Sequence, residues 1–155
     1  MSPPAVIDIK AKAAFPAGAL SNFAAHPFVF DGVACAGMEG FLQSLKTDDQ
    51  SRQAEICALV GEAAQKAGRQ HAWNDAGLLW WRGEAFDRLS DGYQRLLDRA
   101  YAALAEQSPG FRRALLATGD AALTHAIGQT DPCETILTAD EFCGRLMDLR
   151  ARLRG

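Results

Sequence analysis

Three polar side chains that together can carry out acid–base and nucleophilic chemistry share one face of a predicted helix. The segment 37–46 favours a helix, and at about 100° per residue Glu39, Gln43 and Lys46 fall on one narrow arc of it. A carboxyl group can transfer protons, a carboxamide can orient a hydroxyl group, and an amine becomes a nucleophile once it is neutral. We therefore take this row as the first candidate for a catalytic site.

The other two sides of this helix carry no charge. Met38, Phe41, Leu42 and Leu45 form an apolar side, and Gly37, Gly40 and Ser44 form a side of small residues. A helix on a protein surface would show a broad polar face, so we expect protein to enclose this helix on most sides. Buried charges are costly unless they are paired or used. Glu39 and Lys46 then either satisfy partners in a core network or line a cavity where chemistry takes place.

Composition and charge exclude several classes of protein. The 155 residues are enough for one domain, residues 1–155, with a sizeable core, and the 23% of charged residues argues against disorder. A net charge of −3 gives no general attraction to nucleic acid or to an anionic membrane. No apolar run is long enough to cross a membrane, and residues 1–4 lack the pattern of a signal peptide. We therefore expect a cytoplasmic protein that binds no membrane.

The cysteines give no sign of a metal site. Cys35, Cys57, Cys133 and Cys143 are scattered, without the CxxC or Cys/His spacing of metal ligands. We expect four reduced thiols, most of them buried as small apolar side chains. The motifs GxGxxG, GxSxG and HExxH and the Walker loop are also absent. The sequence therefore predicts no cofactor and metal-independent chemistry.

Helices dominate the elements that must position these residues. We expect helices at 37–46, 49–67, 91–106, 108–119 and 138–154, the last with a Thr138–Glu141 capping box and a solvated tail of Arg150, Arg152 and Arg154. Alternation predicts strands at 6–10 and 121–127 and hairpins at 28–35 and 78–88, the first around an Asp31-Gly32 turn. Residues 19–27 and 69–77 are predicted loops. The predicted fold is α+β, a predominantly helical single domain with a small set of hairpin strands.

Three blocks of the sequence occur in an order that is typical of one family. The first block runs from Leu20-Ser21-Asn22-Phe23 through Pro27-Phe28 and Phe30-Asp31-Gly32 to the segment 38–46, which contains Glu-x-x-x-Gln-x-x-Lys. The second is LLATGDAAL at 115–123, and the third is GRLMDLR at 144–150. In these blocks the chain resembles the NADAR domain (YbiA-like) family over about residues 19–153.

This resemblance implies a mostly helical α+β fold and cleavage of N-glycosidic bonds. Family members act on phosphorylated ribosylamine intermediates of riboflavin synthesis or on ADP-ribose attached to guanine. The implied partners are therefore a small ribose phosphate or ADP-ribosyl substrate, including ADP-ribosylated nucleic acid. For the second reaction the family implies a lysine Schiff base with the opened ribose, which places Lys46 as the nucleophile with Glu39 beside it. Glu39 can alternatively activate water at the anomeric carbon while Lys46 holds a phosphate or a hydroxyl group.

Side-chain chemistry adds a set of candidate substrate-binding residues: Asn22, Phe23, Gln43, Trp73, Gly119 and Asp120. The amides would hold ribose hydroxyls, Trp73, Trp80 or Trp81 would stack on a base, and Asp120 would orient a hydroxyl. Structural roles compete with these assignments, since loop asparagines form turns, tryptophans fill cores and glycines end helices. The structural role is favoured more strongly for Trp80, Trp81 and His125 than for the other candidate residues.

The chain departs from the family pattern at its centre and near its C-terminus. Where the family usually has Glu-His, this chain has Glu39-Gly40, and the segment 130–135 stands where the family usually has Asp-x-x-Trp-Gly. Two other hypotheses therefore stand beside the N-glycosidase. The chain is a non-catalytic module that binds ADP-ribose or a nucleotide, or it is an interaction protein without a pocket.

Overall fold

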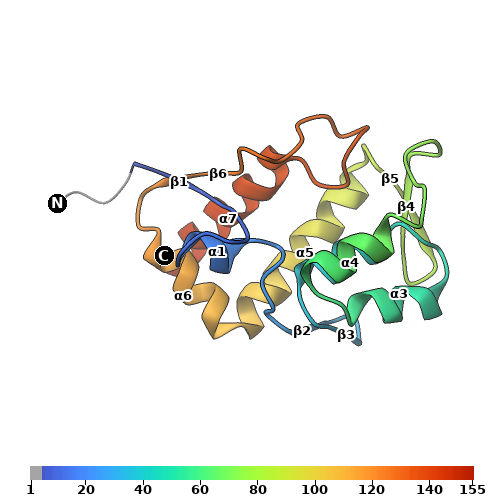
Figure 1. Ribbon diagram of the computed structural model, residues 1–155, viewed down its shortest axis with the longest axis horizontal. Helices are drawn as coiled ribbons and strands as arrows, with labels where there is room; N and C mark the ends of the chain where they lie inside the picture. Colours follow the sequence, from blue (N-terminus) through green and yellow to red (C-terminus); the bar gives the residue numbers. More distant parts are fainter. Residues whose placement is uncertain (1–4) are drawn as a thin grey trace.

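Helices form most of the regular structure in the computed structural model, which describes residues 5–155 (Figure 1). Residues 1–4, for which we expect no signal peptide, lie outside the described residues. The helices are α1 (Ala17–Leu20), α2 (Met38–Ser44), α3 (Gln50–Cys57), α4 (Gly61–Gly68), α5 (Asp91–Gln107), α6 (Pro109–Ala117) and α7 (Ala139–Arg154). The strands are β1 (Val6–Asp8), β2 (Phe28–Phe30), β3 (Val33–Cys35), β4 (Leu78–Trp81), β5 (Glu84–Asp87) and β6 (Ala122–Thr124). The predicted α+β class with helices predominating is confirmed.

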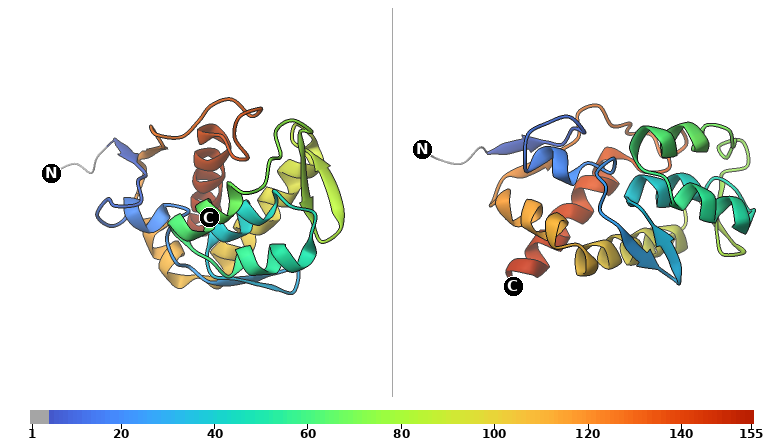
Figure 2. Two further views of the ribbon diagram at one scale, coloured as in Figure 1. Left: turned by 45° about the vertical axis from the view of Figure 1, so that its right-hand side comes forward. Right: turned by 60° about the horizontal axis from the view of Figure 1, so that its bottom comes forward.

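The strands form three separate pairs. Both predicted hairpins are confirmed, as β2–β3 and β4–β5. Their two-residue turns use positive φ angles, 49° and 80° at Asp31-Gly32 and 49° and 87° at Arg82-Gly83, which matches the twist of a tight hairpin. The third pair is parallel and joins β1 to β6, with Ile7 opposite Leu123, so it connects the N-terminal strand to the segment between α6 and α7. Figure 2 shows this pair and the β4–β5 hairpin at opposite ends of the molecule.

Helix α2 lies enclosed in protein, as its residue pattern predicts. All seven of its residues are buried, and it packs against α3 and α4. Phe41 contacts the Trp81 ring edge-on, with ring centroids 5.0 Å apart, and the Trp80 backbone N–H donates to the Leu45 carbonyl at 2.9 Å. Trp81 therefore has the core role that we favoured, and the β4–β5 hairpin holds the end of α2.

The prediction of one helix over 49–67 is wrong. The chain forms α3 and α4 instead, because Val60 is extended and Gly61 has a φ of 51°, which no helix continues through. The break lets both helices pack against α2. A second difference is α1, a single turn that begins in the predicted break at 15–18 and extends into the predicted loop.

One arginine differs from expectation, whereas the capping box and the cysteines agree with it. Arg150 does not belong to a solvated tail, because it is buried and donates hydrogen bonds to the Thr118 hydroxyl and the Ala121 carbonyl, both at 2.8 Å. The Thr138–Glu141 capping box is confirmed. Cys35, Cys57 and Cys143 are buried free thiols as expected, whereas Cys133 is exposed. No helix formed by residues 5–155 is both long and apolar enough to cross a membrane.

Candidate active site

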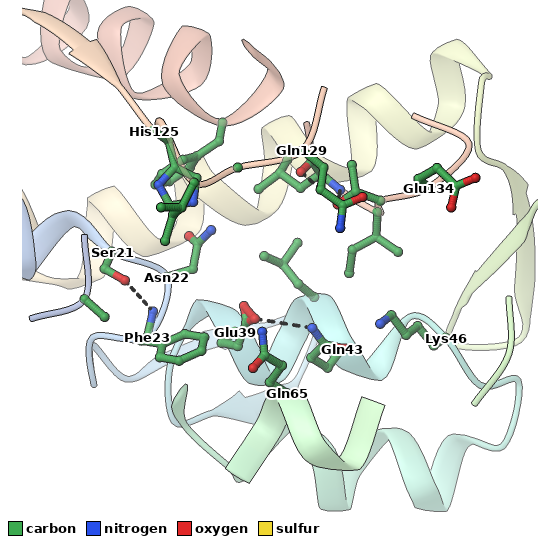
Figure 3. Close-up of a pocket in the computed structure, with 18 of the residues that line it drawn as sticks. Ser21, Asn22, Phe23, Glu39, Gln43, Lys46, Gln65, His125, Gln129 and Glu134 are labelled. Carbon is green, nitrogen blue, oxygen red and sulfur yellow. Dashed lines mark hydrogen bonds between the residues drawn. The ribbon is translucent and has the colours of Figure 1, made fainter. Parts of the chain in front are cut away.

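The polar row of α2 faces a cavity of about 440 Å³ between α2, α4 and the loop that joins β6 to α7 (Figure 3). Six of the eight predicted site residues line this cavity, namely Asn22, Phe23, Glu39, Gln43, Lys46 and Trp73. Asn22 and Phe23 come from the loop after α1, Glu39 and Gln43 from α2, and Trp73 from the loop after α4. Lys46 lies just past the end of α2, because the predicted helix of residues 37–46 ends at Ser44. The row therefore opens onto a hollow, which contradicts the hypothesis of an interaction protein without a pocket.

The two other predicted residues, Gly119 and Asp120, lie outside the cavity lining. Gly119 has a φ of 57° and follows the end of α6, so it ends the helix. The Asp120 side chain is 89% exposed and forms a salt bridge with Arg154 at 2.7 Å. Both residues have the structural role that the sequence left open, and we leave them out of the proposed site.

Glu39 is the buried acid of the cavity. Its residue is 8% exposed, and Gln43 Nε2 donates a hydrogen bond to its Oε1 at 3.2 Å. Burial raises the pKa of Glu39 above its ordinary value of 4.5, since the hydrogen bond from Gln43 and the charge of Lys46 offset that effect only in part. A carboxyl group with a raised pKa retains its proton to a higher pH and can donate it to a leaving group.

Gln43 is held between Glu39 and α4. Its Oε1 has no hydrogen-bond partner among the described residues and lies against Gly68, where an added Cβ would come within 1.8 Å of it. Only a glycine leaves room for the carboxamide at this point. The close approach of α4 therefore fixes the amide so that its N–H group points to Glu39.

Lys46 is the amine of the cavity and is half-buried. Loss of hydration lowers the pKa of Lys46 below 10.5, and the nearby Arg69 lowers it further, while the charge of Glu39 opposes the shift. Neither Lys46 nor Glu39 forms a salt bridge with another residue of the described chain. The Lys46 side chain extends along the cavity in the direction of Gln43 and Glu39 (Figure 3).

The opposite wall of the cavity is the loop of residues 125–138. Arg88 donates from Nε to the Thr135 carbonyl at 2.9 Å and forms a buried salt bridge with Glu141 of α7 at 2.6 Å. The Tyr93 hydroxyl donates to the Ile136 carbonyl at 2.7 Å. These contacts tie the loop to α5 and α7, so the wall that faces α2 is fixed at its C-terminal end.

Several cavity residues have no signal in the sequence. Arg69, Gln129 and Glu134 line the cavity from positions that look like ordinary polar loop or helix-end residues. His125 also lines it, although its alternation with apolar neighbours favoured a structural role. No group of three or more His, Cys, Asp and Glu side chains within residues 5–155 is placed to hold a metal ion.

We expect Glu39→Gln to stabilise the protein, increasingly so as the pH rises. Between pH 4.5 and the raised pKa of Glu39 the folded chain binds more protons than the unfolded chain, so the free energy of unfolding falls as the pH rises through this window. Glutamine keeps the partner for Gln43 and does not titrate. Urea unfolding at pH 4, 6 and 8 should show a stability difference that grows with pH. The exposed Glu106→Gln serves as the control, and a difference that shrinks with rising pH would contradict the assignment.

Comparison with known proteins places the chain in a phage family. Residues 14–151 match the family described as bacteriophage protein GP30.3. The chain belongs to this family. It is 43% identical over 150 residues to an uncharacterized 17.1 kDa protein from the Gp30–rIII intergenic region of Enterobacteria phage T4, covering 95% of this chain and 98% of the phage T4 protein.

The fold of this GP30.3 family member is also that of a bacterial protein. The NMR structure of E. coli YbiA superimposes with a TM-score of 0.65, covering 99% of this chain and 88% of YbiA, at 21% sequence identity. At this identity the likeness concerns the fold. The resemblance to the NADAR (YbiA-like) family is thereby confirmed in architecture.

Proposed function

We propose that the protein is an N-glycosidase that hydrolyses the bond between a ribose carbon and the nitrogen of a base or amine. One observation carries the proposal: a buried carboxyl group on α2 with a raised pKa and an amine just past the end of α2 with a lowered pKa line the same cavity. A carboxyl group that keeps its proton can act as a general acid, and an amine that loses its proton can act as a nucleophile.

In the proposed reaction Lys46 attacks and Glu39 protonates. The neutral Nζ of Lys46 forms a bond to the anomeric carbon, the bond from that carbon to the base nitrogen breaks, and the Glu39 proton passes to the departing nitrogen. Opening of the ribose ring leaves an imine between Lys46 and the sugar. Water then hydrolyses the imine, which releases the sugar, regenerates the amine and returns a proton to Glu39.

The charge distribution of the cavity supports an anionic sugar. Arg69 lines the cavity, and its charge acts on Lys46. A guanidinium group favours phosphate groups. We propose a ribose phosphate or an ADP-ribosyl group as the sugar part, bound with its phosphates toward Arg69 and its anomeric carbon near Glu39.

Direct turnover tests the proposal. The purified protein is incubated in EDTA with an oligonucleotide that carries ADP-ribosylated guanine and, separately, with the phosphoribosylamine intermediate of riboflavin synthesis, and the products are separated by chromatography. We expect release of the free base or amine from one of these, and a rate about a hundredfold to a thousandfold lower for Glu39→Gln. No product from either substrate, or a Glu39→Gln variant with the full rate, would overturn the proposal.

A non-catalytic binding module is the second candidate, because the segment Asp131–Thr135 departs from the family pattern beside the cavity residue Glu134. It makes a different prediction for the same samples. ADP-ribose would raise the melting temperature of the protein while neither substrate yields product. Stabilisation together with turnover would favour the enzyme.

A further inference from the structure

Asn22 presents a fixed hydrogen-bond donor at one end of the cavity. The Tyr101 hydroxyl lies 2.7 Å from Asn22 Oδ1, and Tyr101 is 1% exposed. A buried phenol needs an acceptor for its proton, and Oδ1 is the one hydrogen-bond acceptor of this hydroxyl within the described residues. This contact assigns Oδ1 to Tyr101 and leaves the Asn22 N–H groups to serve the cavity.

His125 presents a fixed hydrogen-bond acceptor in the same region. Its Nδ1 lies 2.8 Å from the Ile9 carbonyl, which only accepts, so Nδ1 carries a proton, and in the neutral ring Nε2 carries a lone pair. The ring packs edge-on against Phe142, with centroids 5.5 Å apart. Gly128 covers the ring so closely that an added Cβ would lie 2.6 Å from His125 Cδ2. These contacts hold the imidazole in one orientation.

The two side chains lie at the end of the cavity away from Lys46. Figure 3 shows Asn22 and His125 next to each other above Phe23, with Glu39 between this group and Lys46. The charge of Arg69 acts on Lys46, at the other end of the row. An anionic sugar phosphate therefore favours the Lys46 end, and a neutral group favours the Asn22 end.

We propose that Asn22, His125 and Phe23 form the subsite for the leaving base, an inference that rests on the proposed function. Asn22 donates to an acceptor on the edge of a planar heterocycle, His125 Nε2 accepts from a donor next to it, and Phe23 supplies apolar ring contact. The ligand class is a neutral base with adjacent C=O and N–H groups, or with the equivalent amidine edge. Glu39 then lies where the base nitrogen joins the sugar.

A paired change in enzyme and substrate tests this inference. The probes are an ADP-ribosylated guanosine, its N1-methyl analogue, which lacks the N–H donor, and the corresponding adenosine compound with an amidine edge. In His125→Asn the shorter amide can still donate to the Ile9 carbonyl, but the cavity loses the Nε2 acceptor. His26→Asn is the matched control, because His26 is also half-buried and contacts the Ala19 carbonyl at 2.7 Å, outside the cavity lining.

We expect the wild-type protein to cleave the guanosine probe with a kcat/KM about tenfold to a hundredfold above that of its N1-methyl analogue. For His125→Asn we expect kcat/KM on the guanosine probe to fall by a similar factor, so that this variant cleaves the guanosine probe and its N1-methyl analogue equally well. His26→Asn should behave like the wild type. Two results would overturn the subsite but not the proposed function. In the first, the wild-type protein cleaves the guanosine probe and its N1-methyl analogue at the same rate and cleaves the adenosine compound no faster. In the second, His125→Asn still cleaves the guanosine probe faster than its N1-methyl analogue. If the wild type cleaves none of the probes, the proposed function fails and the subsite fails with it.

Discussion

Replacing Lys46 with arginine or alanine is expected to lower kcat by roughly a thousandfold, because neither side chain can supply a neutral amine to the anomeric carbon. The arginine variant distinguishes a role of Lys46 as nucleophile from a role in holding a phosphate or hydroxyl group. It keeps the positive charge of Lys46 and can hold a phosphate, so a residue that only binds anions would tolerate it. We therefore expect Lys46→Arg to retain substrate binding and lose turnover.

Chemical trapping gives a second measurement on the same residue. Borohydride added during turnover should reduce the imine and leave a sugar adduct on the peptide that contains Lys46, detectable by mass spectrometry. The control is Lys66→Ala, since Lys66 pairs with Glu62 on an exposed part of α4, with a side chain that is 67% exposed. A Lys46→Arg variant with the wild-type rate would instead assign water as the nucleophile.

Gly40→Ala is expected to lower the free energy of unfolding by about 3 kcal/mol, at the upper end of what overpacking a core costs. An added Cβ at Gly40 would lie 2.4 Å from the Leu59 carbonyl oxygen, 2.8 Å from that of Ile56 and 3.0 Å from that of Cys57. All three are backbone atoms at the end of α3 and just after it, so no side chain can rotate away. Helix α2 must then move, and Glu39 moves with it.

Urea unfolding of Gly40→Ala beside Gly144→Ala measures this effect. Gly144 lies in α7 and has no atom within 4 Å of an added Cβ, so its replacement should stabilise the helix by about 0.5–1 kcal/mol. The two variants make the same chemical change and should shift the unfolding midpoint in opposite directions. A Gly40→Ala protein as stable as wild type would mean that α2 and α3 are not in close contact.

Local patterns predicted much of the fold because they act over a few residues. Ser90 caps α5 by accepting from the Tyr93 N–H, Ser108 and Pro109 begin α6, and the Asp31-Gly32 turn closes a hairpin, as the residue types dictate. The enclosed helix α2 was predictable for a related reason. Glu39, Gln43 and Lys46 of the predicted helix 37–46 occupy one narrow row, so the rest of the helix surface had to face protein.

Features that depend on distant contacts were not predictable. The break between α3 and α4 needs the positive φ of Gly61. The apolar residues keep their helical spacing across this position, so the sequence pattern does not indicate a break. His125 alternates with apolar neighbours, and its place in the cavity depends on the parallel pairing of β1 with β6, which brings the Ile9 carbonyl to its ring. Asp120 was a candidate for orienting a ribose hydroxyl, but it pairs with Arg154 at the end of α7.

A crystal structure of Glu39→Gln with an ADP-ribosylated guanosine would show which side chains surround the anomeric carbon, because the variant should bind this substrate and turn it over only slowly. We predict that the anomeric carbon lies between residue 39 and the Lys46 amine. The base should lie toward Asn22 and His125, and the phosphates toward Arg69. A ligand bound outside this cavity, or side chains that fill the hollow beside α2, would contradict the account.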